Sequence, residues 1–282
     1  MSDKITSVIA RENGGNIQIT FTIPFDLVKR AQEETIAEMA KDIEIPGFRK
    51  GMAPLAKVAE KIPQNRIIEH ALGHLLPPAL AESVEKNNLK LAIYPKFELI
   101  SGKENEPWQI MGLTCELPEV TLGDYKKFVQ GALRASSIIT GPASAKATAG
   151  REEKEGVVIK ALIDNVKIEI PQILIEEEAD SRLSSLLSRL EKLGLALEGY
   201  LASMKKKPED LRAEYAVQAK QAIAIDLILS KIAVDQNMKI EPKEIDEAIK
   251  ISGSSDTSDE RKRLIESILK RRKALDFLIS LV

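Results

Sequence analysis

Alternating apolar and polar side chains at the beginning of the chain predict β-strands. Over residues 16–23 the alternation is strict, which is typical of a strand with one buried face. An Asn- and Gly-rich run at 13–16 separates this stretch from a second strand over 4–11, so the two predict a hairpin. Similar stretches predict two further strands, over 90–100 and 108–117.

Between these two pairs of strands, apolar residues recur at the three- and four-residue spacing of helices. The spacing predicts helices over 25–41, 54–61 and 65–86, the last of them kinked or divided by Pro77-Pro78. The order β-β-α-α-α-β-β favours an antiparallel sheet with helices on one face. We therefore predict an α+β domain over residues 1–120.

The second half of the chain has helical spacing and predicts an all-α domain of long helices over 157–282. Leucines recur every three or four residues from Leu183 to Leu193 and stop at Gly194. Further helices are predicted over 198–204, 208–236, 242–251 and 259–282. Residues 121–156 are predicted to be a linker, because their part at 135–150 is rich in Ala, Ser, Thr and Gly and lacks clear periodicity.

One stretch fits neither a helix nor a strand, namely Gly47-Phe48-Arg49-Lys50-Gly51-Met52-Ala53-Pro54. Its glycines permit tight turns and its proline stiffens one end, so it predicts a shaped loop that presents Phe48, Arg49 and Lys50 to a partner. The plainer alternative is a solvated turn. Phe48 favours the first interpretation, since it has no obvious local core to enter and aromatic residues are enriched at interfaces.

The same stretch resembles the ribosome-docking loop of bacterial trigger factors, whose pattern is Gly-Phe-Arg-x-Gly-Lys-x-Pro. Met52 stands where that family usually has lysine, which removes one cation. The resemblance implies an ATP-independent chaperone without catalytic residues or cofactors. It would dock on large-subunit protein and RNA near the ribosomal tunnel exit and shield unfolded nascent polypeptides with its helical domain. The residues that the resemblance assigns to ribosome binding are Gly47, Phe48, Arg49, Lys50 and Gly51.

Full-length trigger factors also carry an FKBP-type prolyl isomerase domain, for which this chain has little room. Only about 45 residues separate Tyr125 from Pro171, close to the size below which a domain rarely folds alone. No aromatic residue lies between Phe128 and Tyr200, whereas the isomerase pocket of that family is lined with aromatics. We therefore expect no enzyme activity, and prolyl isomerase activity is the alternative function.

Charge narrows the other classes of function. The net charge of −2 disfavours a generally basic nucleic-acid binder, and no DNA partner is expected. A local excess of cations nevertheless leaves an RNA-binding or assembly protein as a third hypothesis. The cations between positions 49 and 66 are Arg49, Lys50, Lys57, Lys61 and Arg66. Glu60 is the single anion in this interval.

The location expected from the sequence is the cytoplasm, without a membrane partner. No run approaches the roughly 18 apolar residues that a membrane-spanning helix needs, and residues 1–6 have no apolar signal core. Whether the free protein forms a homodimer is left open by the sequence.

The chain's single cysteine and two histidines are the remaining candidates for chemistry. Cys115 cannot form an internal disulfide and is expected to be a small buried residue. His70 and His74 have the i, i+4 spacing that can chelate a metal on a helix. The sequence shows no third ligand and no His-Glu-x-x-His order, so no metal site is predicted.

Overall fold

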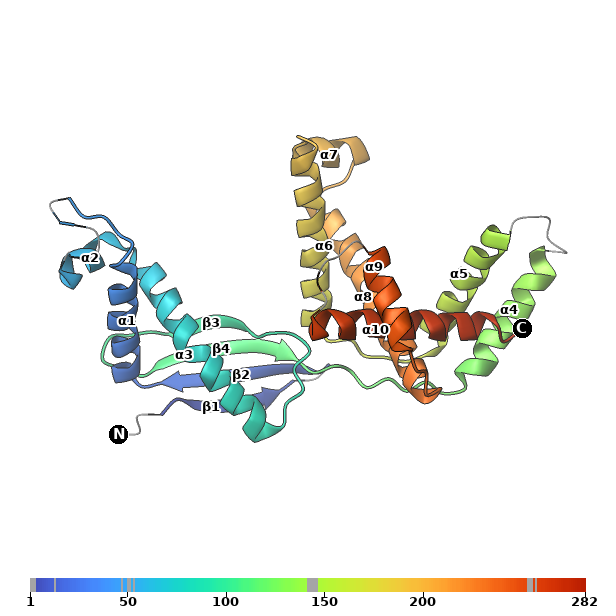
Figure 1. The fold of residues 1–282 in the computed structure, drawn as a ribbon, viewed down its shortest axis with the longest axis horizontal. Coiled ribbons are helices and arrows are strands. Elements are labelled where there is room, and N and C mark those ends of the chain that lie inside the picture. The colour runs from blue at the N-terminus through green and yellow to red at the C-terminus, as the bar shows by residue number, and fades with distance from the viewer. Residues whose placement is uncertain are drawn as a thin grey trace. The chain divides into compact units, whose positions relative to one another are not determined.

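The computed structural model describes residues 4–12, 14–46, 48–49, 52, 54–140, 147–252, 256 and 258–282. The chain forms two compact units, Met1–Leu117 and Pro118–Val282 (Figure 1). The first unit is α+β and the second is helical, which confirms the predicted fold class. No helix among the described residues has both the length and the apolar content needed to cross a bilayer.

The N-terminal unit contains a four-stranded antiparallel sheet in the order β1-β2-β4-β3. The predicted order β-β-α-α-α-β-β is confirmed. The strands are β1 (Thr6–Arg11), β2 (Asn16–Ile23), β3 (Lys96–Ser101) and β4 (Trp108–Cys115), and the helices are α1 (Phe25–Met39), α2 (Leu55–Lys61) and α3 (Gln64–Asn87).

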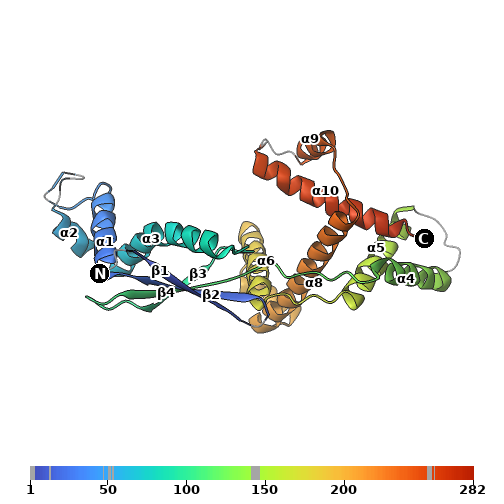
Figure 2. The same ribbon diagram turned by 90° about the horizontal axis from the view of Figure 1, so that it is seen from below.

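One face of the sheet carries the main core of this unit. The strict alternation in β2 places Ile17, Ile19, Phe21 and Ile23 on that face, and all four are buried. β2 pairs with β4 in a register that sets Phe21 opposite Ile110. Helices α1 and α3 cover the same face (Figure 2), and their apolar residues pack with these strands in one cluster. Helices on one face of the sheet are therefore confirmed.

Helix α3 runs unbroken through Pro77 and Pro78, so the predicted division of this helix is wrong. Each proline removes a backbone N–H donor and disfavours a helix interior. Leu76 and Leu80, on either side, are both buried in the core against the sheet. We infer that packing on both sides of the prolines offsets the lost hydrogen bonds.

The strand predicted over 90–100 is shorter than expected, because β3 spans only Lys96–Ser101. Before it, the pairing is limited to an isolated bridge between Leu91 and Glu116. Pro95 lies at the boundary and has no N–H to donate to a ladder, which explains why regular pairing begins only after it.

The C-terminal unit consists of helices throughout its described elements, as predicted. They are α4 (Tyr125–Thr140), α5 (Ala147–Asn165), α6 (Gln172–Lys192), α7 (Leu197–Met204), α8 (Pro208–Asp235), α9 (Pro242–Ile251) and α10 (Asp259–Ile279). Apart from the segment 121–156, the predicted helices agree with these bounds to within a few residues. Gly194, which ends the leucine-rich stretch, adopts a positive φ of 67° just after α6, a conformation that glycine permits.

Helices α4 and α5 occupy much of the segment that the sequence predicts to be a linker. Tyr125, Val129 and Leu133 repeat every four residues along α4 and are buried with Val158 and Leu162 of α5. The described residues of 125–156 therefore belong to the helical unit, and the predicted flexible part at 135–150 includes helical residues at both ends. The Ala- and Ser-rich composition obscured a stripe that packing makes helical.

The apolar contacts of this unit fall into two separate clusters. The larger joins α4 and α5 to the C-terminal halves of α8 and α10, and includes Ile228, Ile232 and Leu278. The smaller joins α6 to the N-terminal half of α8 through Ile175, Ala179 and Ala219. Helices α6 and α8 therefore pair along a seam in which Ile175 and Tyr215 pack with small alanine side chains.

Hydrogen bonds connect the start of α4 to the end of α8. The Tyr125 hydroxyl donates to Asp235 Oδ2 at 2.8 Å, and Gln236 Nε2 donates to the same hydroxyl at 2.9 Å. Burial, followed by the hydrogen bond to Asp235, raises the pKa of Tyr125 to about 12.

Candidate functional site

The loop singled out in the sequence stands on a small core of its own. The chain leaves α1 at Met39 and returns through α2 to the start of α3, beside the loop at one end of the N-terminal unit (Figure 1). Between these elements lies an apolar cluster that is distinct from the core behind the sheet. Its buried members are Ala40, Ile45, Val58, Ile62 and Ile67. This cluster anchors the base of the loop while leaving its tip outside any core.

At the tip, the structure describes two of the five predicted docking residues, Phe48 and Arg49. Gly47, Lys50 and Gly51 lie outside the described residues. The Phe48 backbone N–H donates to the Ile45 carbonyl at 3.0 Å, and the Met52 N–H donates to the Arg49 carbonyl at 2.9 Å. These two bonds produce successive turns, in agreement with a shaped loop.

The aromatic side chain of the tip faces solvent. Phe48 is 39% exposed, and the Lys57 ammonium lies 5.4 Å from the centroid of its ring. This cation–π contact links the tip to α2 and favours a defined ring position. Met52, four residues after Phe48, is 74% exposed, and Leu55 is also exposed. Sequence reasoning treated Met52 as a lost cation and overlooked its apolar surface.

The segment that carries this apolar tip also carries several exposed cations. Arg49, Lys57, Lys61 and Arg66 are all exposed, with Glu60 as the exposed anion among them. An arginine can form paired hydrogen bonds to phosphate or carboxylate, whereas lysine acts as a point charge. The arrangement suits contact with an anionic surface that also offers an apolar patch.

A second candidate surface lies on the helical unit. The leucines from Leu183 to Leu193 do not form a closed core, because only Leu190 among them is buried. Leu187 and Leu193 are exposed, Leu193 by 67%, and Leu195 continues the apolar surface just beyond α6. Exposed apolar patches of this kind mark binding surfaces in many proteins.

The candidates for chemistry take different positions in the N-terminal unit. Cys115 is fully buried, as predicted, and burial raises the pKa of its thiol to about 11. His70 and His74 lie together on exposed turns of α3, where Glu38 of α1 joins them. The expectation that no third ligand accompanies the histidines is therefore wrong, because Glu38 is brought near by helix packing rather than by sequence.

Comparison with known proteins agrees with the architecture. The family model described as "Bacterial trigger factor protein (TF)" matches residues 6–132, and the one described as "Bacterial trigger factor protein (TF) C-terminus" matches residues 142–280. A solved structure described as "Promiscuous Substrate Recognition in Folding and Assembly Activities of the Trigger Factor Chaperone" shares the fold, with a TM-score of 0.63 and 11% identity. That match covers 98% of this chain and 100% of the other.

Curated relatives align over part of the chain. Trigger factor of Streptococcus suis (strain 05ZYH33) is 31% identical over 142 residues, which are 50% of this chain and 33% of the relative. Trigger factor of Streptococcus mutans serotype c (strain ATCC 700610 / UA159) is 36% identical over 108 residues, 38% of this chain and 25% of the relative. The aligned segments therefore span a third or less of these relatives' own length.

Proposed function

Because the chain belongs to the bacterial trigger factor family, we propose that it is a chaperone that docks at the ribosomal tunnel exit and shields nascent polypeptides without ATP. The observation that carries this proposal is the exposed Phe48–Arg49 tip on its separate small core. Both residues belong to the sequence pattern by which the chain resembles the docking loop of that family. We further propose that the protein acts in the cytoplasm.

Docking would use two kinds of contact at the tip. Phe48 and Met52 supply apolar surface to a ribosomal protein, while Arg49 and the cations of α2 face phosphate or carboxylate groups. Exposed charges are screened beyond about 8–10 Å at physiological ionic strength. Docking should therefore weaken as salt is raised, even though its apolar part persists.

The test is co-sedimentation of the full chain with ribosomes. Replacing Phe48, Arg49 and Lys50 together by Ala should abolish pelleting, because it removes both kinds of contact. A matched control removes one exposed aromatic and two exposed lysines elsewhere in the same unit, at Tyr94, Lys86 and Lys90. The docking assignment fails if the triple variant pellets like wild type while remaining folded.

Shielding of clients is assigned to the helical unit, with a revised boundary. The predicted client-binding domain 157–282 would lack α4, whose Tyr125, Val129 and Leu133 complete the larger core. We therefore propose residues 118–282 as the client-binding unit. Its exposed Leu187, Leu193 and Leu195 offer an adaptable apolar surface, whereas a closed bundle would bury them.

This assignment is tested on the full chain by its ability to suppress aggregation of an unfolded protein without ATP. Replacing Leu187, Leu193 and Leu195 together by Ser should reduce protection several-fold. A control with three exposed polar residues of α6, Ser184, Ser185 and Ser188, changed to Ala should protect like wild type. Equal protection by both variants would favour the closed bundle.

The alternative function, prolyl isomerisation, has no residues assigned to it. The two family models leave residues 133–141 between them, and α4 continues into that interval. We propose that the chain does not accelerate isomerisation of a proline peptide above its uncatalysed time of roughly tens to hundreds of seconds. Inhibitor-sensitive turnover in a protease-coupled assay would overturn this proposal.

A further inference from the structure

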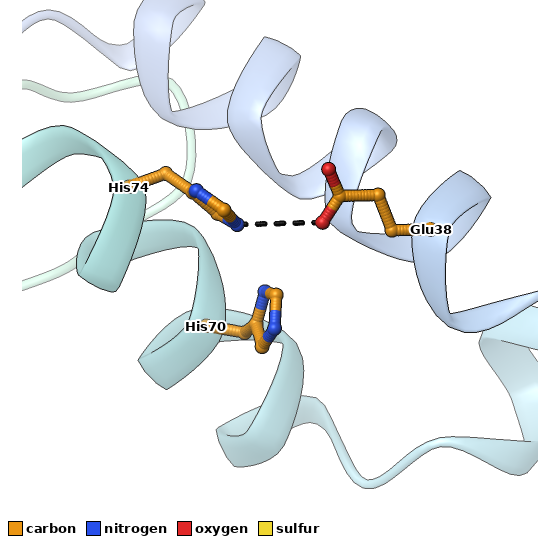
Figure 3. Close-up of side chains that lie close together, drawn as sticks. All are labelled: Glu38, His70 and His74. Carbon is orange, nitrogen blue, oxygen red and sulfur yellow. Dashed lines mark ion pairs between the residues drawn. The ribbon is translucent and has the colours of Figure 1, made fainter.

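Three potential metal ligands converge on the exposed side of the α1–α3 pair. Glu38 lies in the last turn of α1, and His70 and His74 lie one turn apart on α3 (Figure 3). His74 Nε2 is 3.4 Å from Glu38 Oε2, and the two imidazole rings have centroids 4.9 Å apart. One ligand atom from each residue lies within 4.8 Å of the others.

We propose that Glu38, His70 and His74 form a binding site for a divalent transition-metal ion, with Zn²⁺ the best match. Two imidazoles and a carboxylate are ligands that Zn²⁺ accepts at about 2.0–2.2 Å, which sets tetrahedral ligand atoms roughly 3.3 Å apart. The His74–Glu38 separation already has this value. The His70 ligand atom lies within 4.8 Å of the others, so it must approach by at most about 1.5 Å, which a rotation of its exposed ring can supply.

Both histidines of the chain belong to this site. His70 and His74 are its only two histidines, and Cys115 is its only cysteine. Cys115 cannot compete for the ion, because it is fully buried and burial raises the pKa of its thiol to about 11. Both imidazoles of the protein therefore serve one site, and imidazole favours Zn²⁺, Cu²⁺ or Ni²⁺ over Mg²⁺ or Ca²⁺.

The surroundings leave room for the remaining ligands of the ion. All three side chains are exposed, so a water molecule can complete a four-coordinate shell. A cavity of about 650 Å³ adjoins the site, lined by Glu38 and His70 together with Lys61 and Arg66. Asp42 also lines the cavity and offsets part of this positive charge. The exposure of all three ligands favours a modest affinity over the very tight binding of a fully buried structural site.

A bound ion would join α1 to α3 across the segment that carries the loop. Glu38 precedes this segment and His70 follows it, with the core of Ile45, Val58 and Ile62 between them. The ion would thereby clamp both ends of the loop-bearing segment. Without an ion, Glu38 and His74 make only an exposed contact, whose contribution is small.

The first test titrates Zn²⁺ into the full chain, free of any histidine tag and stripped by a chelator, in a calorimeter at neutral pH. One ion should bind per chain. His70→Ala and His74→Ala should each weaken binding at least about tenfold, and Glu38→Gln by a similar factor, since each loses a direct ligand. Glu85→Gln is the matched control, because it removes an exposed carboxylate of α3 that is not part of the cluster, and it should bind like wild type.

The second test follows the two imidazole rings by NMR in protein labelled at histidine. Zn²⁺ should shift the signals of both rings together at one equivalent, whereas Mg²⁺ should shift neither. The proposal is overturned if wild type binds no Zn²⁺ up to millimolar concentration, if the double variant His70→Ala, His74→Ala binds as tightly as wild type, or if only one ring responds.

Discussion

The two units of the chain bury their apolar residues in different ways. In the N-terminal unit, one sheet face gathers α1 and α3 into the main core, which includes Phe21 and Trp108, and a smaller cluster lies beneath the loop. In the C-terminal unit, the apolar contacts divide into a core around Ile228 and a much smaller one around Ile175. A sheet fixes its neighbours through strand register, whereas paired helices can leave whole faces uncovered. The N-terminal unit therefore buries its apolar residues mainly against one sheet face, whereas α6 leaves Leu187 exposed.

Among the substitutions that test this difference, we expect the largest loss of stability from one at Phe21. Phe21→Ala should lower the free energy of unfolding of the N-terminal unit by about 3–5 kcal/mol, because it opens a cavity in a fully buried position. Trp108, the only tryptophan, lies in the same core, so its fluorescence during urea unfolding reports this unit alone. Val8→Ala, at an exposed position of β1, is the control and should change little. An unchanged Trp108 transition in Phe21→Ala would contradict the assignment of Phe21 and Trp108 to one core.

A smaller and more local effect is expected at Ile175. Ile175→Ala should destabilise the α6–α8 seam by about 2 kcal/mol, which corresponds to roughly 30-fold faster amide hydrogen exchange in α6. Amides of α10 near Ala274 and Leu278, in the larger core, should keep their protection. Equal acceleration in α6 and α10 would show that the two clusters unfold as one.

Tyr125→Phe should lower the free energy of unfolding by about 1 kcal/mol, because it removes the hydroxyl that donates to Asp235. Its pKa is raised in the folded state from 10.0 to about 12, so the folded state holds a proton that the unfolded state releases. The stabilisation is therefore complete below pH 10 and is lost as pH rises from 10 towards 12. Urea unfolding followed by circular dichroism should show a steeper alkaline decline in wild type than in Tyr125→Phe. Parallel declines would disprove the linkage.

The smallest effect on stability is expected on the open surface. Leu193→Ala should change the free energy of unfolding by less than about 0.5 kcal/mol, because the side chain is 67% exposed. Leu190→Ala, three residues earlier on α6, is the comparison, since Leu190 is buried and its loss should cost about 2 kcal/mol or more. Similar losses in the two variants would mean that Leu193 is covered in solution.

Much of this arrangement follows from local patterning. The alternation over 16–23 predicts both β2 and its buried face, and the proline and glycine positions predict where most helices begin and end. The Phe48–Arg49 tip is predicted by its poor fit to regular structure and is exposed as expected. These features depend on neighbouring residues, so a single sequence contains them.

Other features depend on contacts between distant segments. Glu38 reaches His74 only because α1 packs beside α3, and nothing in the sequence around Glu38 marks it as a ligand. Helix α4 was missed because its stripe of Tyr125, Val129 and Leu133 is sparse and lies among small residues. The small core beneath the loop was not predicted for a similar reason, since it combines residues from both sides of the loop.

The seam between α6 and α8, which is the smaller cluster around Ile175, has a mechanical consequence. Where large side chains interlock, one helix cannot slide past another without opening voids. In this seam Ile175 and Tyr215 are large, whereas Ala179, Ala216 and Ala219 are small. The exposed Arg212–Asp180 pair, at 3.2 Å, adds only a weak restraint across the seam. Sliding of α6 along α8 would displace Ile175 and Tyr215, but this cluster is much smaller than the core that holds α10. We therefore expect α6 to shift along α8 more readily than α10 shifts within the larger core.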